Sequence, residues 1–258
     1  MIPEDQAIDA ARAAARARQR IVLREVFAVE LPRLHALAYL ATGDAGQARE
    51  ALTTLWAEAP EPEVLAAALP PDVLLATLAR GLADRLGRHP SKTLVVLENT
   101  IRCDVTCAVD PAVPPVDGVE GRIVVLVGEL RRRCLGWVVL TLPPLRRLAW
   151  ILVEVLGVPT AAAAEMLNTS DKGLEVLLRR ARKALTDYIE PRCGHLLRPG
   201  FCTCESRLGV ALAADFVELP EEPSLPPRPG PFASLGELYR GLVIASPHLE
   251  SLAPSGAE

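Results

Sequence analysis

Residues Thr169–Leu185 read TSDKGLEVLLRRARKAL, and this stretch decides the class of fold. Ser170 can begin a helix, because a serine hydroxyl accepts a hydrogen bond from a backbone N–H of the first turn. Apolar residues then recur at helical spacing on one face, at Leu174, Leu177, Leu178, Ala181 and Leu185. Most of the charged residues fall outside this face, at Lys172, Glu175, Arg179, Arg182 and Lys183. The stretch therefore predicts an amphipathic helix with a basic outer surface.

A second, shorter helix is expected directly before this one. Pro159 and Thr160 are typical of a helix start, and AAAAEML follows them. Asn168 and Thr169 then predict a turn. A short helix, a turn of three or four residues and a longer basic helix are typical of a helix-turn-helix unit. The alternative is a plain helical hairpin with a charged solvent face, and the pattern alone favours neither.

The composition of the chain favours an all-α fold. Half of the 258 residues are apolar, only 4% are aromatic, and leucine, valine and alanine dominate. The net charge of −4 excludes a uniformly basic nucleic-acid binder, so any basic surface must be local. The N-terminus lacks a signal-peptide pattern and no apolar run is long enough for a membrane span, so we expect a soluble, cytoplasmic protein. Six cysteines in a chain of this length do not indicate a disulfide scaffold.

Proline and glycine divide the chain into four parts. We expect a helical domain over 1–88, a linker over 89–118, a helix-turn-helix domain over 119–190 and a C-terminal extension over 191–258. Within the first domain, Pro32 predicts a kink or a boundary. Gly43 is expected to end one helix and Asp44 to cap the next.

The second domain resembles the promoter −35-reading region of sigma-70-family factors, and most closely that of the extracytoplasmic-function (ECF) group. The resemblance spans about 45 residues and rests on Leu142-Pro143, Arg146, Gly157, the Ala162–Glu165 run, Ser170 and Arg180-Ala181-Arg182. It implies a helix-turn-helix domain that binds promoter DNA. The implied DNA-binding residues are Ser170, Lys172, Arg179, Arg180, Arg182 and Lys183.

The first domain is similar to the sigma-factor domain that binds core RNA polymerase and the promoter −10 element. The matching positions are Arg49, Glu50, Arg80, Asp84 and Arg88. The resemblance implies RNA polymerase core and promoter DNA as partners, allows for an anti-sigma factor, and implies no membrane partner. Gly81 stands where the family usually carries asparagine, and the aromatic side chains that would stack on opened −10 bases are missing from this helix.

The helix quoted first also departs from the family pattern. Gly173, Glu175 and Val176 replace a small polar residue, a cation and a serine, and Leu177 replaces an arginine. A carboxylate repels phosphates, and leucine and valine offer no donors to base edges. The sequence therefore predicts an ECF-like sigma factor that contacts DNA mainly through phosphates. The alternative is a sigma-derived regulator that has lost promoter reading and acts through protein contacts or through metal or redox sensing.

A Cys/His cluster follows the basic helix in RCGHLLRPGFCTCESRL. Cys193, His195, Cys202 and Cys204 form the pattern C-x-H-x6-C-x-C, which predicts a metal site with zinc as the default and copper as the alternative. Cysteines that pack as small apolar side chains are an equal alternative. Cys134, in an apolar helix, is expected in the core. No nucleophile with an orienting group, no G-x-G-x-x-G and no P-loop is present, so we expect no enzymatic activity.

Overall fold

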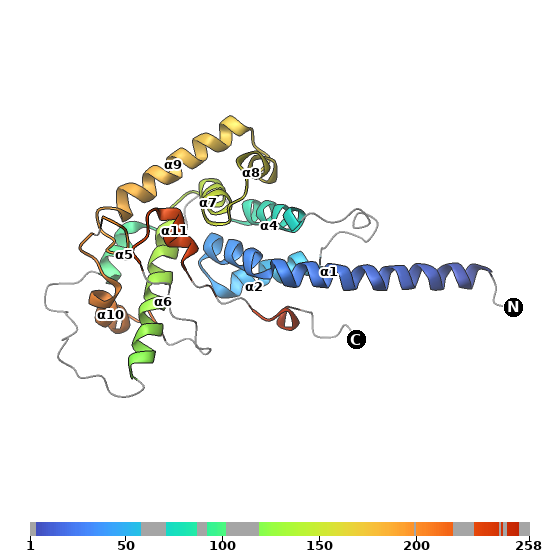
Figure 1. Ribbon diagram of the computed structural model, residues 1–258, viewed down its shortest axis with the longest axis horizontal. Helices are drawn as coiled ribbons and strands as arrows, with labels where there is room; N and C mark the ends of the chain where they lie inside the picture. The colour runs from blue at the N-terminus through green and yellow to red at the C-terminus, as the bar shows by residue number, and fades with distance from the viewer. Residues whose placement is uncertain are drawn as a thin grey trace.

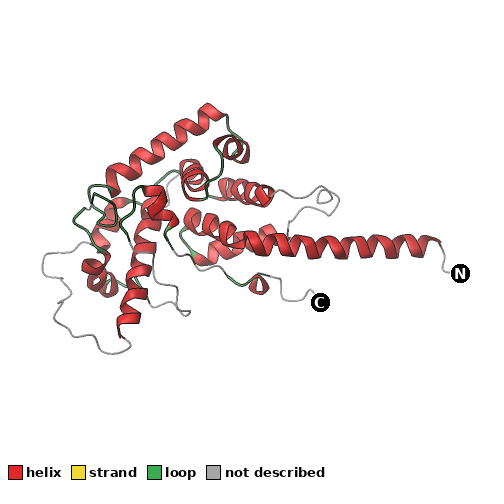
Figure 2. Cartoon of the chain, in the orientation of Figure 1, coloured by secondary structure: helices red, strands yellow, loops and turns green. Residues whose placement is uncertain are grey.

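The computed structural model describes residues 4–57, 71–86, 92–101, 119–198, 200–218, 230–242, 244 and 247–252. Helices are its regular elements, and the described residues contain no strand beyond two isolated bridges (Figure 2). The all-α prediction is thus confirmed. None of the helices in these ranges is long and apolar enough to cross a membrane.

Helix α1 (Glu4–Thr42) is the long helix whose first half projects away from the rest of the molecule (Figure 1). Of the kink or boundary predicted at Pro32, the boundary is wrong, because α1 runs through it. Pro32 and Ala28 both lie on the exposed side, so water can bond the Ala28 carbonyl that proline leaves without its helical partner. The predicted stop is confirmed: Gly43 adopts a φ of 71°, and the Asp44 carboxylate accepts a hydrogen bond from the Gln47 N–H at 2.7 Å.

The first block is a small bundle of α1, α2 (Ala45–Ala57) and α4 (Pro71–Arg85), which pack against one another. Its core is made of fully buried leucines around Phe27, whose ring meets Trp56 edge-on at 5.0 Å between centroids. This bundle places one face of α2 and one face of α4 in solvent.

The predicted linker over 89–118 contains a helix, α5 (Leu94–Ile101), that packs against α6 (Val119–Leu140) and α10 (Cys204–Ala213). Leu97 is fully buried, the Trp137 indole donates to the Thr93 carbonyl at 3.1 Å, and the Lys92 ammonium lies 4.4 Å from the Trp137 ring centroid. The stretch assigned to the linker therefore includes a packed helix, in which Leu97 is the buried residue of the apolar run in TLVVLE. The linker bounds themselves stay a prediction. The rest of the predicted linker lies outside the described residues.

The second block consists of α6, α7 (Pro144–Trp150), a π-helical turn η1 (Ile151–Val155), α8 (Thr160–Met166) and α9 (Asp171–Ile189). It packs directly against the first block, since α6 and α7 contact α1, and α8 contacts α4. A buried side chain joins the blocks: the guanidinium of Arg147 donates to the carbonyls of Ala41, Leu140 and Leu142, the last two at 3.0 Å each. Burial lowers the pKa of Arg147 to about 10, so it stays charged at neutral pH.

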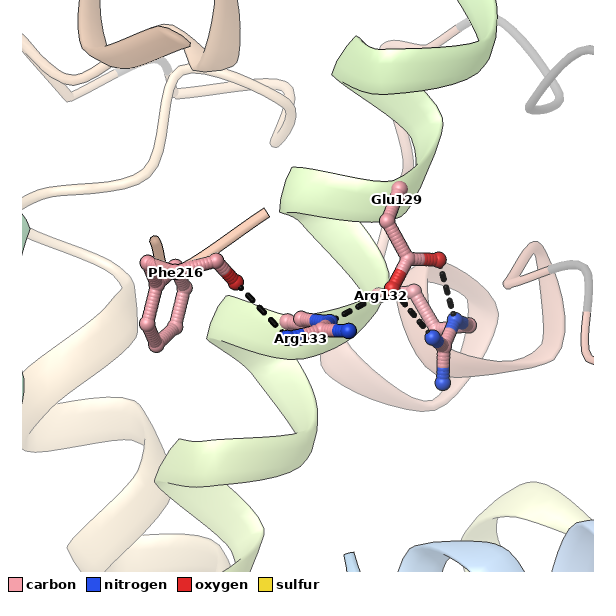
Figure 3. Close-up of polar contacts among 4 residues, drawn as sticks. All are labelled: Glu129, Arg132, Arg133 and Phe216. Carbon is pink, nitrogen blue, oxygen red and sulfur yellow. Dashed lines mark hydrogen bonds and ion pairs between the residues drawn. The ribbon is translucent and has the colours of Figure 1, made fainter. Parts of the chain in front are cut away.

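A polar junction on α6 connects both blocks to the C-terminal extension (Figure 3). Glu129 accepts hydrogen bonds from Arg132 and Arg133, and Arg133 also donates to the Phe216 carbonyl at 3.0 Å. The Arg132 guanidinium lies 4.5 Å from the Tyr39 ring centroid on α1. Burial raises the pKa of Glu129, while the bond from Arg133 opposes that rise. Because Arg132 and Arg133 both bond Glu129, the buried carboxylate is not left unpaired.

The C-terminal extension lies on the second block. Its helix α11 (Leu235–Arg240) packs on η1, and Tyr239 is buried with its ring edge-on to Trp150 at 4.6 Å between centroids. The Tyr239 hydroxyl donates to the Leu135 carbonyl at 2.8 Å. A buried aromatic pair with a satisfied hydroxyl is a strong anchor, so the extension is part of the fold.

The buried histidine of α1 predicts an acid-sensitive fold. Burial, with the charges of Arg132 and Arg49, lowers the pKa of His35 from 6.5 to about 4. The folded state therefore prefers neutral His35, and this stability is present above pH 6.5 and lost as the pH falls toward 4. Wild type should lose about 2 kcal/mol more unfolding free energy than His35→Leu between about pH 7 and pH 5. Urea unfolding at both pH values measures this difference. Equal losses in the two proteins would mean that His35 does not titrate in this window.

Candidate nucleic-acid interface

Helices α8 and α9 form the predicted helix-turn-helix. The turn is Leu167–Ser170, in which Asn168 takes a left-handed φ of 48° and the Thr169 N–H donates to the Ala164 carbonyl at 2.9 Å. Asparagine tolerates this conformation better than most residues. The Ser170 hydroxyl accepts from the Gly173 N–H at 3.1 Å, so Ser170 caps α9 as expected. This cap fixes where α9 starts relative to α8.

Helix α9 has one buried and one exposed face. Its buried residues are Leu174, Leu178, Ala181, Leu185 and Ile189. Successive residues of an α-helix are rotated by about 100°, so Lys172, Arg179, Arg180 and Lys183 point away from this buried stripe. All four are exposed. The helix lies along the edge of the molecule, away from the first block (Figure 1). These four cations form what we call the basic face of α9.

Three of the predicted DNA-binding residues already have partners within the chain. Arg182 donates through Nε and Nη2 to the Glu154 carboxylate of η1 at 2.8 and 2.5 Å. This pair turns Arg182 toward the domain itself, although its side chain stays 55% exposed. Lys183 bonds Asp187 at 2.9 Å on the exposed surface, and Ser170 serves as the cap. Lys172, Arg179 and Arg180 have the clearest access to a phosphate backbone.

The α9 residues that depart from the sigma-factor pattern differ in how deeply they are buried. Glu175 is exposed, beside the basic face. Leu177 is half-buried and packs against the core, so it is not available to read bases. A face of lysine and arginine with few hydrogen-bonding neighbours suits phosphate contacts better than base contacts.

The Glu154–Arg182 pair predicts a measurable coupling in stability. Because both side chains are partly exposed, the ion pair is worth about 0.5–1 kcal/mol. Unfolding measurements on Arg182→Met, Glu154→Gln and the double variant should give that coupling energy. DNA affinity should fall less for Arg182→Met than for Arg179→Met. A coupling of zero, with a larger loss of DNA affinity for Arg182→Met, would assign Arg182 to DNA.

The candidate polymerase-binding residues lie on two adjacent helices of the first block. Arg49 and Glu50 are exposed on α2, and Arg80 and Asp84 are exposed on α4. Helices α2 and α4 pack together, and we call the four exposed residues Arg49, Glu50, Arg80 and Asp84 the α2–α4 surface. Arg88 lies outside the described residues.

The predicted Cys/His cluster comes together in the extension. An isolated bridge pairs Cys193 with Cys202, and His195 Nε2 lies 3.2 Å from the Cys204 sulfur. The cysteines are free thiols. As the side chains stand, no three His, Cys, Asp or Glu residues among those described are arranged to hold a metal ion. Proximity of the four residues is thus observed, whereas metal ligation stays a prediction.

The comparisons with known proteins point to the part of the chain that holds the helix-turn-helix. Residues 132–185 match the family model described as sigma-70, region 4. These residues form a sigma-70 region 4 domain. The ECF RNA polymerase sigma factor SigJ of Mycobacterium tuberculosis (strain ATCC 25618 / H37Rv) is 29% identical over 164 residues, which are 63% of this chain and 50% of that protein. The chain thus spans about half the length of this curated relative. No solved structure matches this chain.

The predicted kinship with ECF sigma factors is confirmed by these two matches. The region 4 match covers the end of α6 and all of α7, η1, α8 and most of α9. Two important residues of this region 4 domain were missed from the sequence: Arg147, where Arg146 was singled out, and Glu154. Arg146 and Arg147 are adjacent on α7, but only Arg147 is buried. Glu154 pairs with Arg182 only because η1 packs beside α9.

Proposed function

We propose that the chain is an ECF-like sigma factor that binds core RNA polymerase in the cytoplasm and directs it to promoters. The observation that carries this proposal is the basic face of α9, presented outward by a capped helix-turn-helix. Lys183 of this face pairs with Asp187, whereas Lys172, Arg179 and Arg180 make no ion pair with the other described residues and are placed for an anionic ligand. Region 4 supplies the promoter contact in this proposal, and the α2–α4 surface supplies the polymerase contact.

DNA contact through the basic face would depend strongly on salt. Each phosphate neutralised by lysine or arginine releases counterions, so affinity falls steeply as salt rises. Phosphate contacts position the domain without specifying sequence. Selectivity for promoters would then come from the neighbouring surface of α9, from DNA shape and from the polymerase.

Binding to core polymerase tests the first half of the proposal. The full chain should form a complex with core enzyme and compete with another sigma factor for it. Reversing charges on the α2–α4 surface, as Arg49→Glu with Arg80→Glu, should weaken this competition about tenfold or more. Arg198→Glu, on the exposed part of the extension, is a control that should compete as wild type does. Competition unaffected by the double reversal would move the polymerase contact elsewhere.

The second candidate function is a sigma-derived regulator without promoter reading. The observation that favours it is the departure on α9: Glu175 is exposed beside the basic face, and Leu177 packs against the core in place of the family's arginine. Such a regulator would bind core polymerase without initiating transcription at discrete sites. It would act through protein contacts, with an anti-sigma factor among its partners, or through a metal- or redox-responsive extension.

A further inference from the structure

Three parts of the chain meet at one turn of α6. Arg133 donates to the Phe216 carbonyl, and the Leu135 carbonyl accepts the Tyr239 hydroxyl at 2.8 Å. Cys134 stands between these two residues, and it packs against the hydrophobic core. The segment with the Cys/His pattern reaches the same place, because α10, which begins at Cys204, packs along α6. Cys134 therefore lies near the cluster, close enough for Cys204, Cys202 and Cys193 to affect its pKa, although no spacing in the sequence links it to the pattern.

Backbone hydrogen bonds hold the ligand-bearing segments in register. The Gly194 N–H donates to the Cys202 carbonyl and the Cys202 N–H donates to the Arg192 carbonyl, both at 2.8 Å. Neighbouring extended segments lie about 4.8 Å apart, so this bridge brings the two segments within reach of one ion. The 3.2 Å approach of His195 Nε2 to the Cys204 sulfur shows that side chains from both segments meet.

Burial separates the cysteines into an inner set and an outer one. Cys134, Cys193 and Cys204 pack against the core, whereas Cys202 is half-buried outside that packing. Burial raises the pKa of all three inner thiols, that of Cys204 to about 12, and each is raised further by neighbouring cysteines. The charge of Arg131 opposes this rise at Cys193 and Cys204.

We propose that Cys134, Cys193, His195 and Cys204 bind one zinc ion that fastens the C-terminal extension to helix α6. Three thiolates and an imidazole are a common set for structural zinc. The complex would carry one negative charge, and buried Arg131 supplies the matching positive charge. Cysteine has a single side-chain torsion, so ligation needs rotation of side chains between staggered positions while the hydrogen-bonded backbone stays in place. Cys134 takes the place that the sequence pattern assigned to Cys202.

Metal content of single variants tests the ligand set. The full chain, carrying a tag without histidine and purified without chelator, should hold about one zinc per chain. Cys202→Ser should keep it, and so should the control Cys103→Ser, Cys107→Ser, which changes the two cysteines that lie outside the described residues. Cys134→Ser and Cys204→Ser should hold less than about a tenth of it. Wild type without zinc, wild type with copper in its place, or Cys134→Ser with full zinc would each overturn the proposal.

Cobalt substitution of wild type keeps the test independent of variants that fail to fold. Zinc-free wild type titrated with Co²⁺ should show the intense thiolate-to-cobalt absorption of a tetrahedral site, saturating at about one ion per chain. Zinc added afterwards should abolish it. Absence of that absorption, or a Cys193–Cys202 disulfide in the purified protein, would overturn the proposal. This test does not depend on DNA or polymerase, so its outcome is separate from that of the proposed function.

Discussion

Replacing Arg147 with methionine lowers the free energy of unfolding by about 3–5 kcal/mol. Methionine fills much of the space of the arginine stem but donates no hydrogen bond. The carbonyls of Ala41, Leu140 and Leu142 then lose their partner in a site where Arg147 is fully buried. Because one of these carbonyls ends α1 and the other two flank the α6–α7 turn, both blocks should loosen together.

Arg146→Met is the matched control for this change. Arg146 is the adjacent residue and half-exposed, so its loss should change the free energy of unfolding by less than about 0.5 kcal/mol. Urea denaturation of both variants and of wild type measures the difference. Equal effects of the two substitutions would show that Arg147 does not join the blocks.

Reversing two charges on the basic face of α9 weakens DNA binding about 100-fold. The variant Arg179→Glu, Arg180→Glu removes two cations that point away from the core and adds two charges that repel phosphates. The slope of log affinity against log salt should also become shallower, since fewer counterions are released. Fluorescence anisotropy with duplex DNA over a range of salt concentrations gives both quantities.

The control for net charge is Arg24→Glu, Arg198→Glu, which makes the same change at exposed positions on α1 and in the extension. It should reduce DNA affinity by no more than about threefold. The variant Glu175→Lys is expected to have the opposite effect. It should tighten binding to all duplexes, because it removes a carboxylate beside the basic face. Similar losses in the control and in the Arg179, Arg180 variant would mean that α9 does not contact DNA.

Local signals in the sequence were sufficient for the helix ends. Gly43, Asp44 and Ser170 act at the positions that their chemistry predicts, because capping depends on residues within one turn. The turn between α8 and α9 was also within reach of local reasoning. Pro32 does not end α1, because the effect of a proline depends on whether the freed carbonyl faces water, and the packing side of α1 decides that.

Contacts between distant segments could not be predicted in the same way. Arg182 has the sequence features of a DNA-binding arginine, yet it bonds Glu154, 28 positions away. Cys134 reads as a core residue until the extension returns to α6 and brings Cys204 close to it. Helix α5 lies in a stretch that proline marks as a linker, and only its packing on α6 and α10 explains why it is helical.

Transcription from genomic DNA with purified core polymerase tests the central claim most directly. Core enzyme with the wild-type chain should initiate at a small set of discrete sites that core enzyme alone does not use. The Arg179→Glu, Arg180→Glu variant should bind core polymerase normally and yet lose these transcripts. Binding of the wild-type chain to core enzyme without any discrete transcript would contradict the sigma-factor account and leave the regulator without promoter reading in its place.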